Sequence, residues 1–239
     1  DESADVQDLL DGAERKIMEV SSRKTRSGFV KIGDVLQESL QQIDELYQKD
    51  ATITGLATGY HALDKMTSGL HPDELIIVAA RPGVGKTAFA LNIAQNIGTS
   101  TDETVAIFSL EMGAMQLVNR MLCAEGLIDA SRMRNGQLLP EEYEKLIVAM
   151  ASLSKANIYI DDTPGIRMSE IRAKSRRLMK ERGNLGVIII DYLQLIEGSG
   201  RESRQQEVSE ISRQLKKLSK ELQVPVIALS QLSRGVEHR

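Results

Sequence analysis

Residues 80–87 carry the clearest chemical signal in the sequence. They read ARPGVGKT, directly after a short apolar run and directly before a helical pattern. Gly83 and Gly85 let backbone N–H groups turn toward phosphate oxygens, Lys86 would reach the β- and γ-phosphates, and the Thr87 hydroxyl would bind Mg²⁺. The usual pattern begins with Gly, so Ala80 departs from it by one methyl group. The predicted residues for binding ATP are Ala80, Arg81, Pro82, Gly83, Val84, Gly85, Lys86 and Thr87.

Three polar residues follow other apolar runs and would complete such a site. Asp191 ends the run 187–190, where a carboxylate can hold the Mg²⁺ that bridges nucleotide phosphates. Glu111 could orient and deprotonate an attacking water, although it could also simply open a helix near the positive end of the helix dipole. Gln231 could hydrogen-bond a γ-phosphate or form a turn. We predict Glu111, Lys86 and Gln231 as catalytic residues, and Thr87 and Asp191 as metal ligands.

The elements that must position these residues lie after residue 51, where apolar runs alternate with helical patterns. The runs are continuously apolar, as expected for strands of a parallel sheet that helices cover on both faces. Ligands of such sheets bind beyond the carboxyl ends of the strands, where the candidate residues lie. We therefore predict an α/β fold with a doubly wound, mostly parallel sheet. The expected strands are 75–79, 105–108, 158–160, 187–190 and 226–229, and the expected helices lie near 87–97, 115–125, 141–152, 168–182 and 205–222.

The first fifty residues have a different character. Residues 1–20 hold seven acids and two bases, with apolar residues on one helical face, and residues 21–28 read as a polar linker. A second amphipathic pattern follows. Two such helices without strands must bury their apolar stripes on their own globular domain or on another subunit. We predict three parts: an acidic helix and linker (1–28), a second amphipathic helix (29–50), and an α/β domain (51–239) that lacks its last strands.

Composition narrows the function classes. The chain has 239 residues, 41% hydrophobic and 27% charged, which excludes wholesale disorder. A net charge of −4 excludes a uniformly basic surface that coats nucleic acid. Aromatic residues amount to only 3%, which argues against modules that stack bases on aromatic platforms.

Other features bear on location and on metal sites. Cys123 is the only cysteine, so we expect a reducing compartment such as the cytoplasm and no disulfide framework. No apolar run reaches the roughly 18 residues of a membrane span, and a chain that begins with Asp1 is expected to be a piece of a longer one. Asp161 and Asp162 could suggest a metal pair, but the TPG that follows them favours a turn and a helix cap.

Four segments in order, AARPGVGKT, SLEM, VIIIDYLQLI and VIALSQLSR, resemble the DnaB family of bacterial replicative helicases, within the RecA-like hexameric ATPases. The helices before residue 51 resemble that family's linker region, which implies that residues 1–28 are a remnant of an N-terminal part and that the linker helix (29–50) docks on a neighbouring subunit. The resemblance of the ATPase domain covers about residues 52–239. It implies a RecA-like P-loop ATPase that forms a ring-shaped homo-hexamer around single-stranded DNA. Such a ring would move 5′ to 3′ using ATP and Mg²⁺, unwind duplex DNA at the fork, and work with primase and a helicase loader.

The resemblance also assigns roles to residues of this chain. Lys86 and Thr87 would bind phosphate and Mg²⁺, Glu111 would activate water, Asp191 would support Mg²⁺ and Gln231 would sense the γ-phosphate. The family's collar domain would precede this chain. Its arginine finger and main DNA-gripping loop would follow residue 239.

Two alternatives to this function stay open on the sequence. One is another RecA-like ATPase, of recombinase or circadian-clock type; the other is a nucleotide-bound interaction module without turnover of its own. DNA contacts are also open. The helices 168–182 and 205–222 are rich in Lys and Arg, although such faces are usually just solvated, and the glycine-containing stretch 197–201 is the best loop candidate for backbone contact.

Overall fold

The computed structural model describes residues 29–49, 53–198, 200 and 203–232. The chain divides into two compact units, Asp1–Ala51 and Thr52–Arg239. The acidic helix predicted within residues 1–28 lies outside the described residues. In the first unit the described element is the helix α2 (Ile32–Lys49), which agrees with the second amphipathic pattern of the sequence.

The second unit holds a five-stranded sheet with the order β1-β5-β4-β2-β3. All four strand pairings are parallel, which confirms the predicted α/β fold. Every predicted strand and helix of this unit is present within a few residues of its predicted bounds. The elements are α3 (His61–Thr67), β1 (Leu75–Ala80), α4 (Lys86–Ser100), β2 (Val105–Ser109), α5 (Ala114–Gly126), α6 (Ala130–Asn135), α7 (Pro140–Ser154), β3 (Ile158–Asp161), α8 (Met168–Arg182), β4 (Val187–Asp191), the 3₁₀ helix η1 (Leu193–Leu195), α9 (Arg204–Leu222) and β5 (Val226–Gln231).

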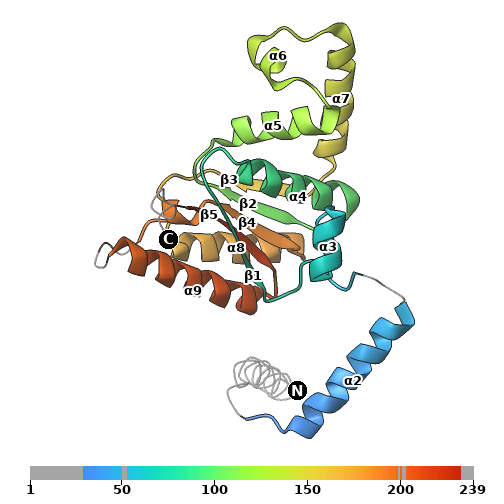
Figure 1. Ribbon diagram of the computed structural model, residues 1–239, viewed down its shortest axis with the longest axis vertical. Helices are drawn as coiled ribbons and strands as arrows, with labels where there is room; N and C mark the ends of the chain where they lie inside the picture. Colours follow the sequence, from blue (N-terminus) through green and yellow to red (C-terminus); the bar gives the residue numbers. More distant parts are fainter. Residues whose placement is uncertain (1–28, 50–52, 199, 201–202, 233–239) are drawn as a thin grey trace, which may run out of the picture. The chain divides into compact units, whose positions relative to one another are not determined.

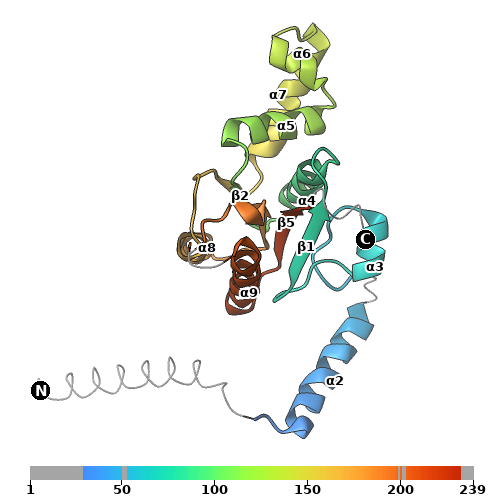
Figure 2. The ribbon, with the colours of Figure 1, turned by 60° about the vertical axis from the view of Figure 1, so that its left-hand side comes forward.

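Helices cover both faces of the sheet (Figures 1 and 2). The helix α4 packs on one face, and α8 and α9 pack side by side on the other. The helices α5, α6 and α7 form a group that projects beyond α4 (Figure 1). The sheet thus has a layer on each side, and the carboxyl ends of its strands point toward the start of α4.

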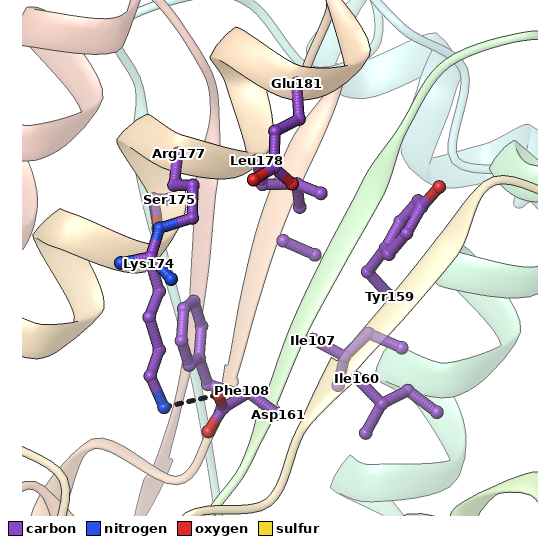
Figure 3. A pocket seen from close by; sticks show the side chains of 11 residues that line it. Ile107, Phe108, Tyr159, Ile160, Asp161, Lys174, Ser175, Arg177, Leu178 and Glu181 are labelled. Atoms are coloured by element: carbon purple, nitrogen blue, oxygen red, sulfur yellow. Dashed lines mark hydrogen bonds and ion pairs between the residues drawn. The ribbon is translucent and has the colours of Figure 1, made fainter.

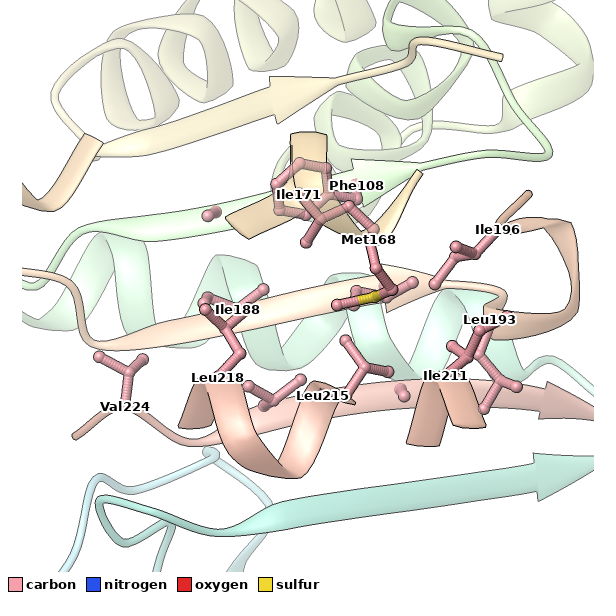
Figure 4. Packing of buried hydrophobic residues seen from close by; sticks show 14 of the residues in the cluster. Phe108, Met168, Ile171, Ile188, Leu193, Ile196, Ile211, Leu215, Leu218 and Val224 are labelled. Carbon is pink, nitrogen blue, oxygen red and sulfur yellow. The ribbon is translucent and has the colours of Figure 1, made fainter. Parts of the chain in front are cut away.

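Two hydrophobic clusters, one on each face of the sheet, explain why the apolar runs form strands and the amphipathic segments form helices. The central strands β2 and β4 are buried over their whole length, as their continuous apolar sequences require. Figure 4 shows the cluster on the α8 and α9 face, where Leu215 and Leu218 of α9 lie beneath Ile188 of β4. Because α9 repeats apolar residues at helical spacing, one of its faces fills this layer and the other stays in solvent.

Polar side chains fix several helix starts. Ser203 and Gln206 form a capping box at the start of α9, with the Ser203 N–H donating to Gln206 Oε1 at 3.1 Å. Asp161 Oδ1 accepts the Thr163 N–H at 3.0 Å, and Asp162 Oδ2 accepts the N–H of Ala114 at 2.8 Å, at the start of α5. The predicted turn at Asp161 is therefore confirmed, whereas the helix that Asp162 caps is α5 and not the helix that follows it in the chain. The capped helix lies 48 residues away in sequence, so no local pattern could have identified it.

The sequence did not predict α3, α6 and η1. Each has at most seven residues. So short a stretch offers hardly two turns of apolar periodicity, and in such helices the local caps and tertiary contacts decide the structure. In α6 the cap is Asp129, whose Oδ1 accepts the N–H groups of Ser131 and Arg132 at 2.8 and 3.0 Å.

Candidate functional site: a phosphate-binding loop at the carboxyl ends of the strands

The loop between β1 and α4 has the backbone that its glycines predict. Gly83 has φ 78° and Gly85 has φ 96°, both in the left-handed region that side chains with a Cβ rarely adopt. No atom lies within 4 Å of where a Cβ would stand at either position, so the backbone angle rather than crowding requires glycine. Gly85 is the N-cap of α4, so the N-terminus of this helix opens directly onto the loop.

Lys86, the first residue of α4, holds a buried positive charge. The residue is only 9% exposed, and its Nζ has no hydrogen-bond partner among the described residues. The Nζ lies 4.1 Å from the centre of the Tyr192 ring, whose face attracts a cation. Leaving a buried ammonium group without hydrogen bonds is energetically costly, so this position is prepared for an anionic partner.

Thr87 and Asp191 meet although 104 residues separate them. The Thr87 hydroxyl donates to Asp191 Oδ2 at 2.7 Å. Asp191 is 4% exposed, and its other oxygen, Oδ1, has no partner among the described residues. Burial raises the pKa of the Asp191 carboxyl, while the Thr87 hydrogen bond and the Lys86 charge oppose that rise. The two predicted metal ligands are therefore in contact, and one carboxylate oxygen is left to bind a cation.

Glu111 follows β2 and Gln231 ends β5, the two strands that flank β4 in the sheet. The Leu110 N–H donates to the Asp191 carbonyl at 2.8 Å, which ties the residue before Glu111 to the end of β4. Glu111 is exposed, and its negative charge also raises the pKa of Asp191. Gln231 ends β5, opposite Ala80 in the parallel register. Both residues thus border the same loop.

A cavity of about 440 Å³ gathers these groups. Most of the predicted site residues line it. Ala80, Arg81, Val84 and Asp191 do not, although the buried Asp191 contacts Thr87 of the lining. Two residues that the sequence analysis missed, Gln116 and Arg120 of α5, also line it. They are four apart on one helix, so they share a face and point the same way. The lining residues are Pro82, Gly83, Gly85, Lys86, Thr87, Ala88, Glu111, Met112, Gln116, Arg120 and Gln231.

Gln194 is another residue that the sequence analysis missed. Its Nε2 donates to Ser230 Oγ at 2.8 Å and to the Gln231 carbonyl at 3.2 Å, and its Oε1 accepts the Gln231 N–H at 3.2 Å. The side-chain amide therefore makes with Gln231 the pair of hydrogen bonds that a neighbouring backbone would make. It lies three residues after Asp191, so one chain segment carries the buried carboxylate and also holds Gln231.

The rest of the described chain offers no competing site of the kinds considered on the sequence. No group of three or more His, Cys, Asp and Glu side chains gathers in the described residues as it would around a metal ion. None of the described helices is both long and apolar enough to cross a membrane. In the stretch 197–201, residues 199 and 201 lie outside the described residues, so its use as a DNA loop stays a prediction.

A parallel α/β sheet with a glycine loop, a buried lysine and a Thr–Asp pair at its strand ends defines the class of phosphate-binding-loop nucleotide-binding domains. Residues 55–239 match the family described as "DnaB-like helicase C terminal domain". The chain therefore belongs to the DnaB-like helicase C-terminal domain family.

Curated relatives and solved structures agree with this family. The chain is 65% identical over 237 residues to the replicative DNA helicase DnaC of Bacillus subtilis (strain 168), covering 98% of this chain and 52% of the relative. It is also 65% identical over 233 residues to the replicative DNA helicase DnaB of Geobacillus stearothermophilus, covering 97% and 51%. The chain thus spans about half the length of these relatives.

Two solved structures share the fold. One is described as an ATPase domain, with TM-score 0.82 and 38% identity over 89% of this chain and 75% of that one. The other is "The Structure Of A DnaB-Like Replicative Helicase And Its Interactions With Primase", with TM-score 0.79 and 37% identity over 95% of this chain and 54% of that one. The predicted RecA-like fold class is confirmed.

Proposed function

We propose that this domain is the ATP-hydrolysing motor of a ring-shaped replicative helicase that moves 5′ to 3′ on single-stranded DNA and unwinds duplex DNA at the fork. The observation that carries the proposal is the pair of buried, unpartnered polar atoms at the loop, Lys86 Nζ and Asp191 Oδ1. A cation and an oxygen atom left over at one site fit a phosphate chain together with its Mg²⁺. Family membership supplies the helicase context.

The residues present fit ATP and Mg²⁺ in separate ways. Backbone N–H groups from Gly83 to Thr87 and the start of α4 suit phosphate oxygens, and Lys86 adds a full charge. Asp191 and the Thr87 hydroxyl suit a hard cation that prefers oxygen ligands. Bound Mg²⁺ neutralises charge that develops on the phosphates during transfer.

We assign Glu111 the role of orienting and deprotonating the attacking water. The position of Glu111 supports this role, because Glu111 is exposed on the wall of the cavity that Lys86 and Thr87 also line. Gln231 lies on the same wall, and its amide suits the γ-phosphate. Because the Gln194 side chain hydrogen-bonds the backbone of Gln231, a displacement of Gln231 would be transmitted to the segment that follows Asp191.

The proposed assembly is a homo-hexamer, and α2 supports it. Its apolar residues Val35, Leu36, Leu40 and Ile43 repeat at helical spacing and are all exposed in the single chain. We propose that this stripe docks on a neighbouring copy. The proposed division of the chain is into residues 1–28, 29–50 and 51–239. Single-stranded DNA, primase and a helicase loader are the proposed partners, and the cytoplasm is the proposed compartment.

Part of the basic surface of α8 and α9 has internal partners. Arg176 pairs with Glu221, Lys174 pairs with Asp161, and Lys216 Nζ donates to the Asp73 carbonyl. These residues hold α8 and α9 in place, so they are poorer DNA candidates than their number suggests. We therefore keep the stretch 197–201, which joins η1 to α9, as the proposed DNA contact.

The test is nucleotide binding and turnover by the intact protein, with and without single-stranded DNA. Lys86→Ala is expected to weaken ATP binding at least about 10-fold, because the loop loses its buried charge. Lys65→Ala, which removes an exposed lysine of α3, is the matched control and should bind ATP normally. Equal affinity in both variants would overturn the site. Normal ATP binding with no turnover, with or without DNA, would favour the second candidate, an interaction module.

A further inference from the structure

The strand β3 is an open edge of the sheet. Among the described strands it pairs only with β2. The Asn157 carbonyl accepts the Val105 N–H on the β2 side, so alternation turns the N–H and C=O groups of Ile158 and Ile160 outward. No described residue hydrogen-bonds these outward groups. An exposed row of this kind is a template for an additional strand.

A cavity of about 270 Å³ borders β3 on the α8 face (Figure 3). Its base is apolar and partly aromatic, with Phe108 and Leu178, and Tyr159 forms the side nearest the edge. Two acids and two bases line it: Asp161 pairs with Lys174 at 2.6 Å, and the other two are Glu181 and Arg177. Glu181 forms no ion pair within the described part of the chain.

This cavity is incompletely filled by the chain itself. Ser175 is 1% exposed, and its Oγ has no hydrogen-bond partner among the described residues, although it borders the cavity. An unpartnered buried hydroxyl is unfavourable unless another group reaches it.

A second cavity, of about 280 Å³, borders the same strand on the opposite face. The side chains of Ile158 and Ile160 point into it, because they alternate with those of Tyr159 and Asp161. The rest of its lining comes from α5 and α7 and is almost wholly aliphatic, namely Val118, Met121, Leu122, Met150, Leu153 and Ser154. A strand added beside β3 would therefore place alternate side chains in an aliphatic pocket and in a partly aromatic one that carries charges of both signs.

We propose that residues 29–31 of a second copy add to β3 as this extra strand, and the inference rests on the proposed homo-oligomer. Phe29 is 112% exposed and Val30 is 67% exposed in the single chain, and both precede the start of α2. Val30 would enter the aliphatic pocket. Phe29 and Lys31, which share the other face of an extended segment, would meet Phe108 and Tyr159 and the carboxylate of Glu181.

The chemistry of the two pockets selects this segment. In an extended segment, Phe29 and Lys31 lie on one face and Val30 on the other, which suits a partly aromatic, charged pocket and an aliphatic one. Backbone hydrogen bonds to Ile158 and Ile160 supply affinity, and the two pockets supply specificity. The same segment continues directly into α2, whose apolar stripe is also exposed among the described residues.

Cross-linking between two copies tests the contact in the intact protein. In a Cys123→Ala background, a preparation with Lys31→Cys is mixed with one carrying Glu181→Cys and treated with a short bis-maleimide. We expect a cross-linked dimer from this mixture and none from the matched mixture of Lys31→Cys with Lys220→Cys, an exposed position on α9. Equal products from both mixtures would overturn the proposal. A product from Leu40→Cys with Glu181→Cys would also overturn it, since α2 would then occupy the pocket.

The dissociation constant of self-association provides a second test that needs no cross-linking reagent. Phe29→Ala is expected to raise the dissociation constant of self-association about 10-fold or more, as loss of a buried aromatic anchor does. Met66→Ala, which truncates an exposed apolar side chain on α3, is the control and should not change it. Unchanged association in Phe29→Ala overturns the inference. Lys86-dependent ATP binding is measured in the same preparations, so a failure of the proposed function remains distinguishable.

Discussion

The helices α2 and α9 have the same kind of sequence and opposite surroundings. Both are amphipathic and nearly equal in length, with 18 and 19 residues. In α9, Leu215 and Leu218 are 0% exposed, whereas Leu36 and Leu40 of α2 are 60% and 61% exposed. An apolar stripe thus predicts that a helix will be covered, but it does not tell which surface covers it.

Polar groups also differ in whether they find partners within the chain, and those at the nucleotide site differ in this from polar groups elsewhere. The Asp162 carboxylate and the Gln194 amide find their partners within the chain. Lys86 Nζ and Asp191 Oδ1 are buried without partners among the described residues. Both α2 and the loop therefore have groups that the described residues leave exposed or without a partner, and each indicates a binding partner of matching chemistry.

The largest expected effect compares the two helices directly. Leu215→Ala should lower the free energy of unfolding by about 2–5 kcal/mol, because it leaves a cavity beneath β4. Leu40→Ala should change it little at concentrations where the chain is monomeric, yet weaken self-association. Urea unfolding followed by circular dichroism measures the first quantity, and sedimentation measures the second. Equal destabilisation by both substitutions would mean that α2 packs on its own chain.

Glu111→Gln sharpens the comparison at the nucleotide site. The substitution keeps the size of the side chain but removes the proposed general base, so ATP turnover should fall at least about 100-fold, or roughly 2.7 kcal/mol in activation free energy. ATP affinity should be retained. Glu144→Gln on α7, an exposed position, is the control. Turnover near that of the unmodified protein would show that Glu111 only opens the next segment.

Gln194→Ala tests a polar group that is satisfied within the chain. Loss of its contacts to Ser230 and Gln231 should lower turnover about 10-fold and leave ATP affinity nearly unchanged, because the amide positions Gln231 and does not line the cavity. Steady-state kinetics with equilibrium binding separates these quantities. Gln137→Ala, at an exposed position, is the control. A loss of affinity as large as the loss of turnover would contradict the positioning role.

The smallest effect concerns pH and the Asp161–Lys174 pair beside the open edge. Burial pushes the pKa of Asp161 up, but hydrogen bonds from Lys174 and Thr163 outweigh it, so the pKa lies below the usual 3.8. Its stabilising contribution is therefore present above pH 3.8 and is lost as pH falls through the lower folded value. Asp161→Asn should be less stable by under about 1 kcal/mol at pH 7, and the difference should vanish in acid. A pH-independent difference in unfolding free energy would contradict this.

The sequence predicted most of the sheet and the loop because those signals are local. Four apolar residues before Asp191 require a buried strand, and the glycine spacing before Lys86 requires one backbone path. Gln116 and Arg120 were missed because a polar residue on a helix gives no sign of which cavity it borders. The roles of Glu111 and Gln231 stay predictions, since their positions fit the chemistry without testing it.

The sequence by itself determined the order of strands along the chain, the phosphate-binding loop and the apolar stripes, because each depends on residues close together in the chain. Only the tertiary structure decided the strand order in the sheet, the meeting of Thr87 with Asp191, the grip of Gln194 on β5 and the two pockets beside β3. These features join segments dozens of residues apart. Their energy comes from burial and hydrogen bonds that exist only after the chain has folded, so no local pattern encodes them.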